Sequence, residues 1–132
     1  MKLEALTPML RTWDLPGTLA FYRDVLGFTC NAASEEWGWA SLARDSVEIM
    51  LASPNQHVGD TAPAFTGSLY FRTDDVEALW RELRDRARVC YPLETFDYGM
   101  REFAIYDPNG YLLQFGQPVA AGHDVTTIGP AG

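Results

Sequence analysis

The 132-residue chain has few of the residues that build metal centres or disulfide frameworks. Its two cysteines, Cys30 and Cys90, fit neither a zinc-binding cysteine pair nor the disulfide pattern of a small secreted protein. The chain also has no apolar stretch as long as a membrane span and no basic-then-apolar signal at its N-terminus. We therefore expect reduced cysteines and a cytoplasmic protein.

Basic residues are also scarce, with ten lysines and arginines against eighteen aspartates and glutamates. The net charge of −8 argues against nucleic acid and anionic membranes as partners, because both repel a negative protein. It favours a cationic ligand, although the same acidity could serve only to keep the protein in solution. A chain of this length can bury one core, so we expect a single domain over residues 1–132.

The clearest structural pattern is a β-hairpin predicted at residues 98–115. Its turn, Asp107-Pro108-Asn109-Gly110, combines a proline that fixes one φ angle with a glycine that accepts a positive one. A three-residue loop pairs residue 107 with 111, which places 104 opposite 114 and 103 opposite 115. Strand alternation then predicts one covered apolar face and one mixed face that is open to a ligand or to water. The apolar face is Phe103, Ile105, Leu113 and Phe115, and the mixed face is Glu102, Ala104, Tyr106, Leu112 and Gln114.

Periodicity predicts two amphipathic helices and six further strands. The first helix is expected to begin after an Asp14 cap and to end at Gly27, and the second to begin after a cap at Thr73 or Asp74. Pro8 cannot donate a ladder hydrogen bond, which suits an edge strand. The expected strands are 5–13, 28–33, 37–43, 47–52, 68–72 and 88–92, followed by a loop at 92–97 and the hairpin.

A short pattern, Arg-Thr-x-Asp-apolar, occurs at residues 11–15 and again at 72–76, with an offset of 61. Each copy joins a strand to a helix, and further strands follow. Since a βαβββ unit cannot bury its helix alone, the sequence predicts an α+β fold of two such repeats. They would form a curved eight-stranded mixed sheet with the helices outside and a concave face left open. The first module is expected at about 5–52, a linker at about 53–66, the second module at about 67–117 and a flexible tail at 118–132.

Two stretches resemble the vicinal oxygen chelate superfamily, which includes glyoxalase I, extradiol dioxygenases and bleomycin resistance proteins. Residues 19–28, Leu-Ala-Phe-Tyr-Arg-Asp-Val-Leu-Gly-Phe, look like the first helix of that superfamily, and residues 107–111 look like its closing hairpin. The resemblance covers residues 5–117 and implies the glyoxalase/bleomycin resistance fold.

For the metal-using members, the resemblance implies ligands at four strand positions, which fall here at Thr7, Met50, Ser68 and Gln114. The repeat offset of 61 independently carries position 7 onto position 68. Hydroxyl, thioether and amide groups bind divalent transition metals poorly. The two histidines, at positions 57 and 123, fall in the expected linker and tail. We therefore expect no metal, no cofactor and no catalytic residue.

The concave face carries aromatic, soft and charged side chains instead, which suit a flat and partly apolar ligand. The predicted ligand-binding residues are Trp37, Trp39, Glu48, Met50, Ser68, Tyr70, Tyr98, Glu102 and Gln114. An alternative is that the two tryptophans pack against a second subunit, because interfaces use the same residue types. In that alternative Glu48 and Glu102 neutralise Arg11 and Arg72.

Within the superfamily, the chain is most similar to bleomycin resistance proteins. Residues 99–105, Gly-Met-Arg-Glu-Phe-Ala-Ile, resemble their stretch before the same turn, residues 7–10 their N-terminal arm, and residues 35–37 their acidic-aromatic segment. The resemblance implies a homodimer with two clefts, in which the first strand can cross to the other subunit. It also implies that a planar, cationic antibiotic of bleomycin type is sequestered without chemistry, for resistance or self-protection.

Two other functions remain open. One is a metal-dependent lyase, isomerase or dioxygenase of the same superfamily, with its ligands at other positions. The other is a metal-free enzyme that uses Glu48, Glu102 or Tyr70 as an acid or base. Arg11 and Arg72 would add positive charge to the cleft, which suits a ligand bearing a carboxylate better than a cation.

Overall fold

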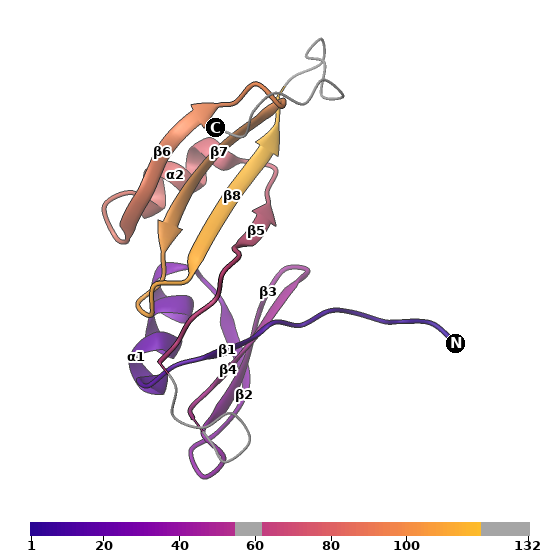
Figure 1. Ribbon diagram of the computed structural model, residues 1–132, viewed down its shortest axis with the longest axis vertical. Coiled ribbons are helices and arrows are strands. Elements are labelled where there is room, and N and C mark those ends of the chain that lie inside the picture. The colour runs from indigo at the N-terminus through magenta and orange to yellow at the C-terminus, as the bar shows by residue number, and fades with distance from the viewer. Residues whose placement is uncertain (55–61, 120–132) are drawn as a thin grey trace. The chain divides into compact units, whose positions relative to one another are not determined.

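The computed structural model describes residues 1–54 and 62–119, and the chain divides into two compact units, Met1–Ala64 and Phe65–Gly132. Residues 55–61 of the linker expected at 53–66 and residues 120–132 of the tail expected at 118–132 lie outside the described residues. Within 1–54 and 62–119 there is no helix with the length and apolar character needed to cross a membrane. The elements, labelled in Figure 1, are β1 (Met9–Arg11), α1 (Leu15–Ala20), the π-helical segment η1 (Phe21–Val25), β2 (Thr29–Ser34), β3 (Trp39–Arg44), β4 (Val47–Ala52), β5 (Leu69–Arg72), α2 (Val76–Leu83), β6 (Arg88–Thr95), β7 (Met100–Tyr106) and β8 (Leu112–Pro118).

The first unit contains a four-stranded sheet in the order β1-β4-β3-β2, with β1 parallel to β4 and the other pairs antiparallel. Its core is formed by five apolar side chains whose relative exposures are 0–6%, Leu10, Ala40, Leu42, Ile49 and Leu51. The predicted first strand, 5–13, is wrong in length, because only Met9–Arg11 pairs with β4. Figure 1 shows the segment before β1 as an extended chain, and Leu6 in it is 93% exposed.

The first helix begins and ends where the sequence predicts. The side chain of Asp14 caps it by accepting a hydrogen bond from the Gly17 backbone N–H at 3.0 Å, and Gly27 follows it with a φ of +73°. The sequence does not predict the π-helical turn, in which the Leu26 N–H donates to the Phe21 carbonyl at 3.1 Å. Arg44 of β3 then donates from Nη1 to the Leu26 carbonyl at 2.8 Å and satisfies the end of the helix.

The strand predicted at 37–43 begins two residues later, at Trp39. Trp37 lies in the turn between β2 and β3, where its backbone N–H donates to Ser34 Oγ at 3.2 Å, and its side chain is 77% exposed. The turn is closed at Gly38, whose φ of +62° suits glycine. Trp37 therefore does not share a strand face with Trp39, and the alternation that placed both on one face is corrected.

The second unit contains a sheet in the order β5-β8-β7-β6, with β5 parallel to β8. The predicted hairpin is confirmed in register, because β7 and β8 pair residue 104 with 114 and 103 with 115. Its loop closes where the Asp107 N–H donates to the Tyr111 carbonyl at 3.0 Å, and Gly110 has a φ of +88°. The apolar face is buried as expected, with Trp80 of α2 packed 5.2 Å from Phe103 between ring centroids.

Two boundaries in this unit differ from the prediction. The strand predicted at 88–92 runs to Thr95, with irregular pairing between Val89 and Tyr91 and again between Tyr91 and Glu94. Pro92 lies in the second irregularity, which lets the strand continue past a residue that cannot donate. The cap of α2 is Asp75, one residue beyond the expected positions, because its side chain accepts from the Ala78 N–H at 3.1 Å.

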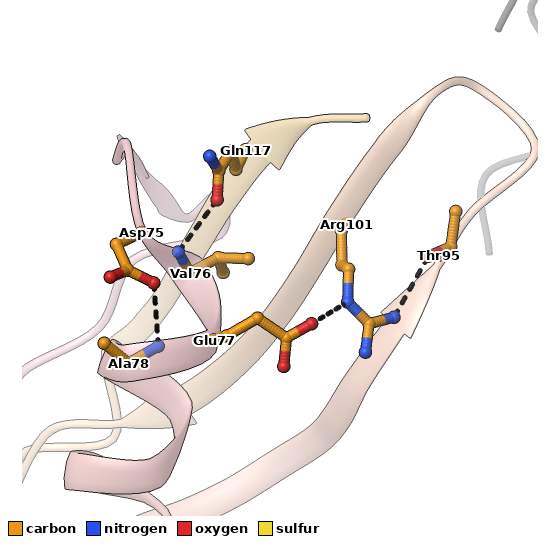
Figure 2. Close-up of polar contacts among 7 residues, drawn as sticks. All are labelled: Asp75, Val76, Glu77, Ala78, Thr95, Arg101 and Gln117. Carbon is orange, nitrogen blue, oxygen red and sulfur yellow. Dashed lines mark hydrogen bonds and ion pairs between the residues drawn. The ribbon is translucent and has the colours of Figure 1, made fainter. Parts of the chain in front are cut away.

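Side chains of β7 and β8 form hydrogen bonds and an ion pair with helix α2 (Figure 2). Gln117 of β8 accepts a hydrogen bond from the Val76 N–H at 2.9 Å, which satisfies a free donor at the start of the helix. On the other side, Arg101 Nε of β7 lies 2.5 Å from Glu77 Oε1, and Arg101 Nη1 donates to Thr95 Oγ1 at 3.0 Å. These contacts hold the helix over the apolar face and leave the mixed face of the sheet uncovered by α2.

The repeated pattern makes the same local structure in both units. Thr12 Oγ1 accepts from the Asp14 N–H at 3.0 Å, and Thr73 Oγ1 accepts from the Asp75 N–H at 3.1 Å. Each aspartate then caps its helix, and the two caps are 61 residues apart. The predicted α+β class with two βαβββ repeats is confirmed, and the strands form two four-stranded mixed sheets, one in each unit.

Candidate functional site

A pocket of about 360 Å³ lies in the second unit, on the sheet face opposite α2. Strand β5 contributes two lining residues, β7 two and β8 one, and the sixth comes from the turn between β6 and β7. The strand register brings them together, since residue 70 of β5 pairs with 114 of β8, which in turn pairs with 104 of β7. The lining residues are Tyr70, Arg72, Tyr98, Met100, Glu102 and Gln114.

The base of the pocket holds a carboxylate that accepts hydrogen bonds from two tyrosines. Glu102 has no exposed surface, yet the four ion pairs of the described residues do not include it. Tyr91 donates to its Oε2 at 2.7 Å, and Tyr98 donates to its Oε1. Hydrogen bonds from both phenols offset the loss of hydration that burial of a charged group would otherwise cost.

A chain of hydrogen bonds continues from this carboxylate to the edge of the sheet. Gln114 Nε2 donates to the Tyr91 hydroxyl oxygen at 2.8 Å and reaches Glu102 Oε2 at 3.5 Å. Ser68 donates to Gln114 Oε1 at 2.5 Å. Because the amide oxygen of Gln114 accepts from Ser68 while its Nε2 donates to Tyr91 and Glu102, these contacts fix the orientation of the amide.

The tyrosines of the network stay protonated at neutral pH. Burial is the main cause that raises the pKa of Tyr91, and the hydrogen bond to Glu102 and its negative charge raise it further. The same causes raise the pKa of Tyr98, again with burial first. For Tyr70 burial and the charge of Glu102 raise the pKa, while Arg72 lowers it. The pocket therefore presents phenols as neutral hydrogen-bonding groups.

The structure brings together five of the nine predicted ligand-binding residues. Four of them, Tyr70, Tyr98, Glu102 and Gln114, line the pocket, and Ser68 is hydrogen-bonded to Gln114. The other four belong to the first unit, where the register places Trp39 of β3 and Glu48 and Met50 of β4 on one face of the sheet and Trp37 lies in the turn. The alternative in which Glu102 neutralises Arg72 is replaced by the two tyrosine hydrogen bonds.

Sequence reasoning missed Tyr91, although it completes the network. Simple alternation along β6 puts Tyr91 on the face of Val89, which pairs with Ile105 on the apolar side. The irregular pairing after Val89 moves Tyr91 to the position opposite Ala104, on the pocket face. A bulge of this kind leaves no reliable signal in one sequence, except that a tyrosine directly before Pro92 sits where strand pairing is disturbed.

The donor groups of this pocket do not fit a divalent transition metal. Ser68 and Gln114 occupy two of the positions that the resemblance assigns to ligands, and a hydroxyl and an amide bind such ions weakly. The amide oxygen of Gln114 is already engaged by Ser68. Among residues 1–54 and 62–119, no three histidine, cysteine, aspartate or glutamate side chains lie close enough to hold a metal, and both histidines fall outside these ranges.

Comparison with known proteins gives a family and a set of similar structures. Residues 5–115 match the model of the Glyoxalase/Bleomycin resistance protein/Dioxygenase superfamily. A bleomycin resistance determinant encoded on the transposon Tn5 is 26% identical with a TM-score of 0.70, over 89% of this chain and 100% of that chain. The bleomycin-binding protein from bleomycin-producing Streptomyces verticillus, complexed with copper(II)-bleomycin, is 25% identical with a TM-score of 0.66, over 87% and 96%. A glyoxalase/bleomycin resistance protein/dioxygenase from Nocardioides shares the fold at 18% identity, with a TM-score of 0.73 over 100% and 92%. No curated protein matches the chain significantly.

Proposed function

Because the chain belongs to the glyoxalase/bleomycin resistance protein/dioxygenase superfamily, as its sequence predicts, we propose that it sequesters a planar, cationic antibiotic of bleomycin type without chemistry. Two similar structures support this ligand class, since one is a bleomycin resistance determinant and the other holds copper(II)-bleomycin. Such a protein would act in antibiotic resistance or in self-protection by lowering the free concentration of the drug. Binding alone would suffice for that role.

The observation that carries the proposal is the pocket over Glu102. Its walls combine two tyrosines with a methionine, which suits a flat and partly apolar ligand. Stacking of a ring on each tyrosine would contribute on the order of 1 kcal/mol. The buried negative charge of Glu102 and the net charge of −8 favour the approach of a cation.

Among the described residues, the chemistry of the donor groups at the pocket supports binding over metal-dependent chemistry. A lyase, isomerase or dioxygenase of this superfamily would need strong ligands on rigid strands, whereas Ser68 and Gln114 offer a hydroxyl and an amide that are bonded to each other. The carboxylate of Glu102 is likewise engaged by two phenols. A metal-free reaction would need a free acid or base, whereas both carboxylate oxygens of Glu102 already accept hydrogen bonds from tyrosines.

We further propose that the chain forms a homodimer through its N-terminal segment. In the first unit, five large apolar side chains in β1 and in the segments beside it are exposed to water. The relative exposures are 126% for Met1, 98% for Leu3, 93% for Leu6, 58% for Met9 and 62% for Trp13. An extended apolar arm followed by a proline and an edge strand is suited to pair with a second copy of the chain.

Calorimetric titration of the purified chain with metal-free bleomycin tests the proposal. We expect saturable binding, and we expect Tyr98→Ala to weaken it by at least about tenfold, because one stacking face and one hydrogen bond to the site are lost. Trp37→Ala tests the part of the site predicted in the first unit, and tryptophan fluorescence should be quenched by the ligand in the wild type but not in this variant. Glu82→Gln, on the exposed side of α2, is the matched control and should bind normally.

Two outcomes would contradict this function. One is the absence of heat and quenching across bleomycin-type and other planar cationic compounds. The other is a stoichiometric divalent ion, found by metal analysis of the purified protein, on which a catalytic turnover depends. The second outcome would assign the chain to the metal-dependent lyases, isomerases or dioxygenases of the superfamily instead.

A further inference from the structure

The pocket of the second unit has two polar side chains that the protein itself does not use. Tyr70 and Arg72 are alternate residues of β5, so they project from the same face of the sheet, and both line the pocket. In residues 1–54 and 62–119 neither the phenol of Tyr70 nor the guanidinium of Arg72 has a hydrogen-bond or ion-pair partner. This separates them from Glu102, Gln114 and Tyr98, which are all engaged.

The unused groups are donors. The guanidinium offers several N–H groups in a planar fork and cannot accept a hydrogen bond. The phenol of Tyr70 keeps its proton at neutral pH, because burial and the nearby carboxylate raise its pKa. An acceptor on the ligand can therefore satisfy both groups at once, and an oxyanion satisfies the charge as well.

The glycine that pairs with Arg72 makes room for Tyr70. Gly116 of β8 pairs with Arg72 on one side and with Glu102 on the other. The ring of Tyr70 lies across Gly116 so closely that a Cβ atom there would collide with the phenol oxygen. The missing side chain of Gly116 thus leaves the space that the Tyr70 phenol occupies.

We infer that Arg72 and Tyr70 form an acid-binding subsite, and that the planar guest of this pocket carries a carboxylate in addition to the cationic group that the acidic protein attracts. The guanidinium binds the carboxylate with paired N–H groups, and the tyrosine hydroxyl donates to one of its oxygens. The inference rests on the proposed function in one respect, which is that this pocket holds the ligand. It deepens that function, because a guest with both charges is a narrower class than a cation.

Matched aromatic probes test the subsite, since naphthoate, naphthamide and naphthylmethylamine share one ring system and differ in the charge of one substituent. We expect the wild type to bind naphthoate at least about tenfold more tightly than naphthamide, the size of effect typical of a charge-assisted pair. Arg72→Gln should remove this preference, so that naphthoate and naphthamide bind equally. Tyr70→Phe should reduce the preference, and Arg81→Gln, which removes an exposed arginine of α2, should preserve it.

Three results of these titrations would overturn the inference. Equal binding of naphthoate and naphthamide, no binding of naphthoate, or a preference that survives Arg72→Gln would each show that the donor pair does not bind a carboxylate. Displacement of naphthoate by inorganic phosphate at equal concentration would overturn the assignment to a carboxylate. A bleomycin titration of the same samples separates the two proposals: drug binding without a naphthoate preference defeats the subsite alone, and a preference without drug binding defeats the antibiotic alone.

Discussion

The hydroxyl of Tyr91 lies 2.7 Å from Oε2 of Glu102, so that a buried carboxylate is held by a residue of the neighbouring strand. The two residues belong to β6 and β7, and their side chains meet because the pairing of those strands is irregular around Tyr91. The hydrogen bond therefore links β6 to the pocket residue Glu102 of β7. Its contribution to stability and the titration of the Tyr91 hydroxyl can both be measured.

The first prediction concerns stability at alkaline pH. The pKa values of Tyr91 and Tyr98 are raised above the ordinary 10.0 in the folded protein. A raised folded pKa contributes stability that is fully present below the unfolded pKa, and this contribution is lost as the pH rises from about 10 towards the folded value. The melting temperature should therefore fall above about pH 10, and the fall should be shallower in Tyr91→Phe and Tyr98→Phe. A pH dependence in these variants equal to that of the wild type would contradict the raised pKa values.

The second prediction concerns Glu102 itself. Glu102→Gln keeps the shape of the side chain but offers one acceptor oxygen to two phenols, so one hydrogen bond is lost or rearranged. We expect the free energy of unfolding to fall by about 1–3 kcal/mol in a urea titration. Glu82→Gln makes the same change on an exposed helix face and should alter stability by less than about 0.5 kcal/mol. If both variants unfold at the same urea concentration, the network does not stabilise the fold.

The third prediction compares the hydrogen bonds of Gln117 to the start of α2 with the ion pair between Arg101 and Glu77 of the helix. Gln117→Ala removes two hydrogen bonds, one in which Gln117 accepts from the Val76 N–H and one in which it donates to the Asp74 carbonyl. We expect the free energy of unfolding to fall by about 1–2 kcal/mol. Arg101→Ala breaks an ion pair whose side chains are 36% and 51% exposed, and should cost about 0–1 kcal/mol because water screens it. Urea unfolding of the two variants measures both values. The reverse order would mean that the ion pair, and not the hydrogen bonds of Gln117, fixes α2.

The fourth prediction concerns the N-terminal arm. Removal of residues 1–6, or the pair of changes Leu3→Asp and Leu6→Asp, takes away the exposed apolar side chains that precede β1. We expect a dimer of the full chain to shift towards the monomer in analytical ultracentrifugation, since apolar burial would drive the association. Glu4→Gln leaves the arm apolar and should keep the dimer. A full chain that sediments as a monomer at all accessible concentrations would refute the proposed assembly.

The sequence alone was sufficient for the elements whose signal is local. The turn residues at 107–110 set the register of the β7–β8 hairpin, because a three-residue loop allows one pairing of the strands that leave it. The sequence predicted the first helix cap at Asp14 and placed the second within two residues of Asp75, since a side chain and a backbone N–H two or three residues away decide a cap. The α+β fold followed from these signals, and the resemblance of residues 19–28 and 107–111 indicated the superfamily, which the family model confirms.

Tertiary structure decided which side chains meet in the pocket, including most of the hydrogen bonds around Glu102. Whether Tyr91 faces the helix or the pocket depends on one irregular pair in β6, which the partner strand determines. That Glu102 meets two phenols from different elements, and that Tyr70 lies close against the backbone of Gly116, follows from the packing of the strands. Such contacts join residues of different strands that a single sequence does not relate, because strand alternation gives a face and the packing of neighbouring strands gives the partner.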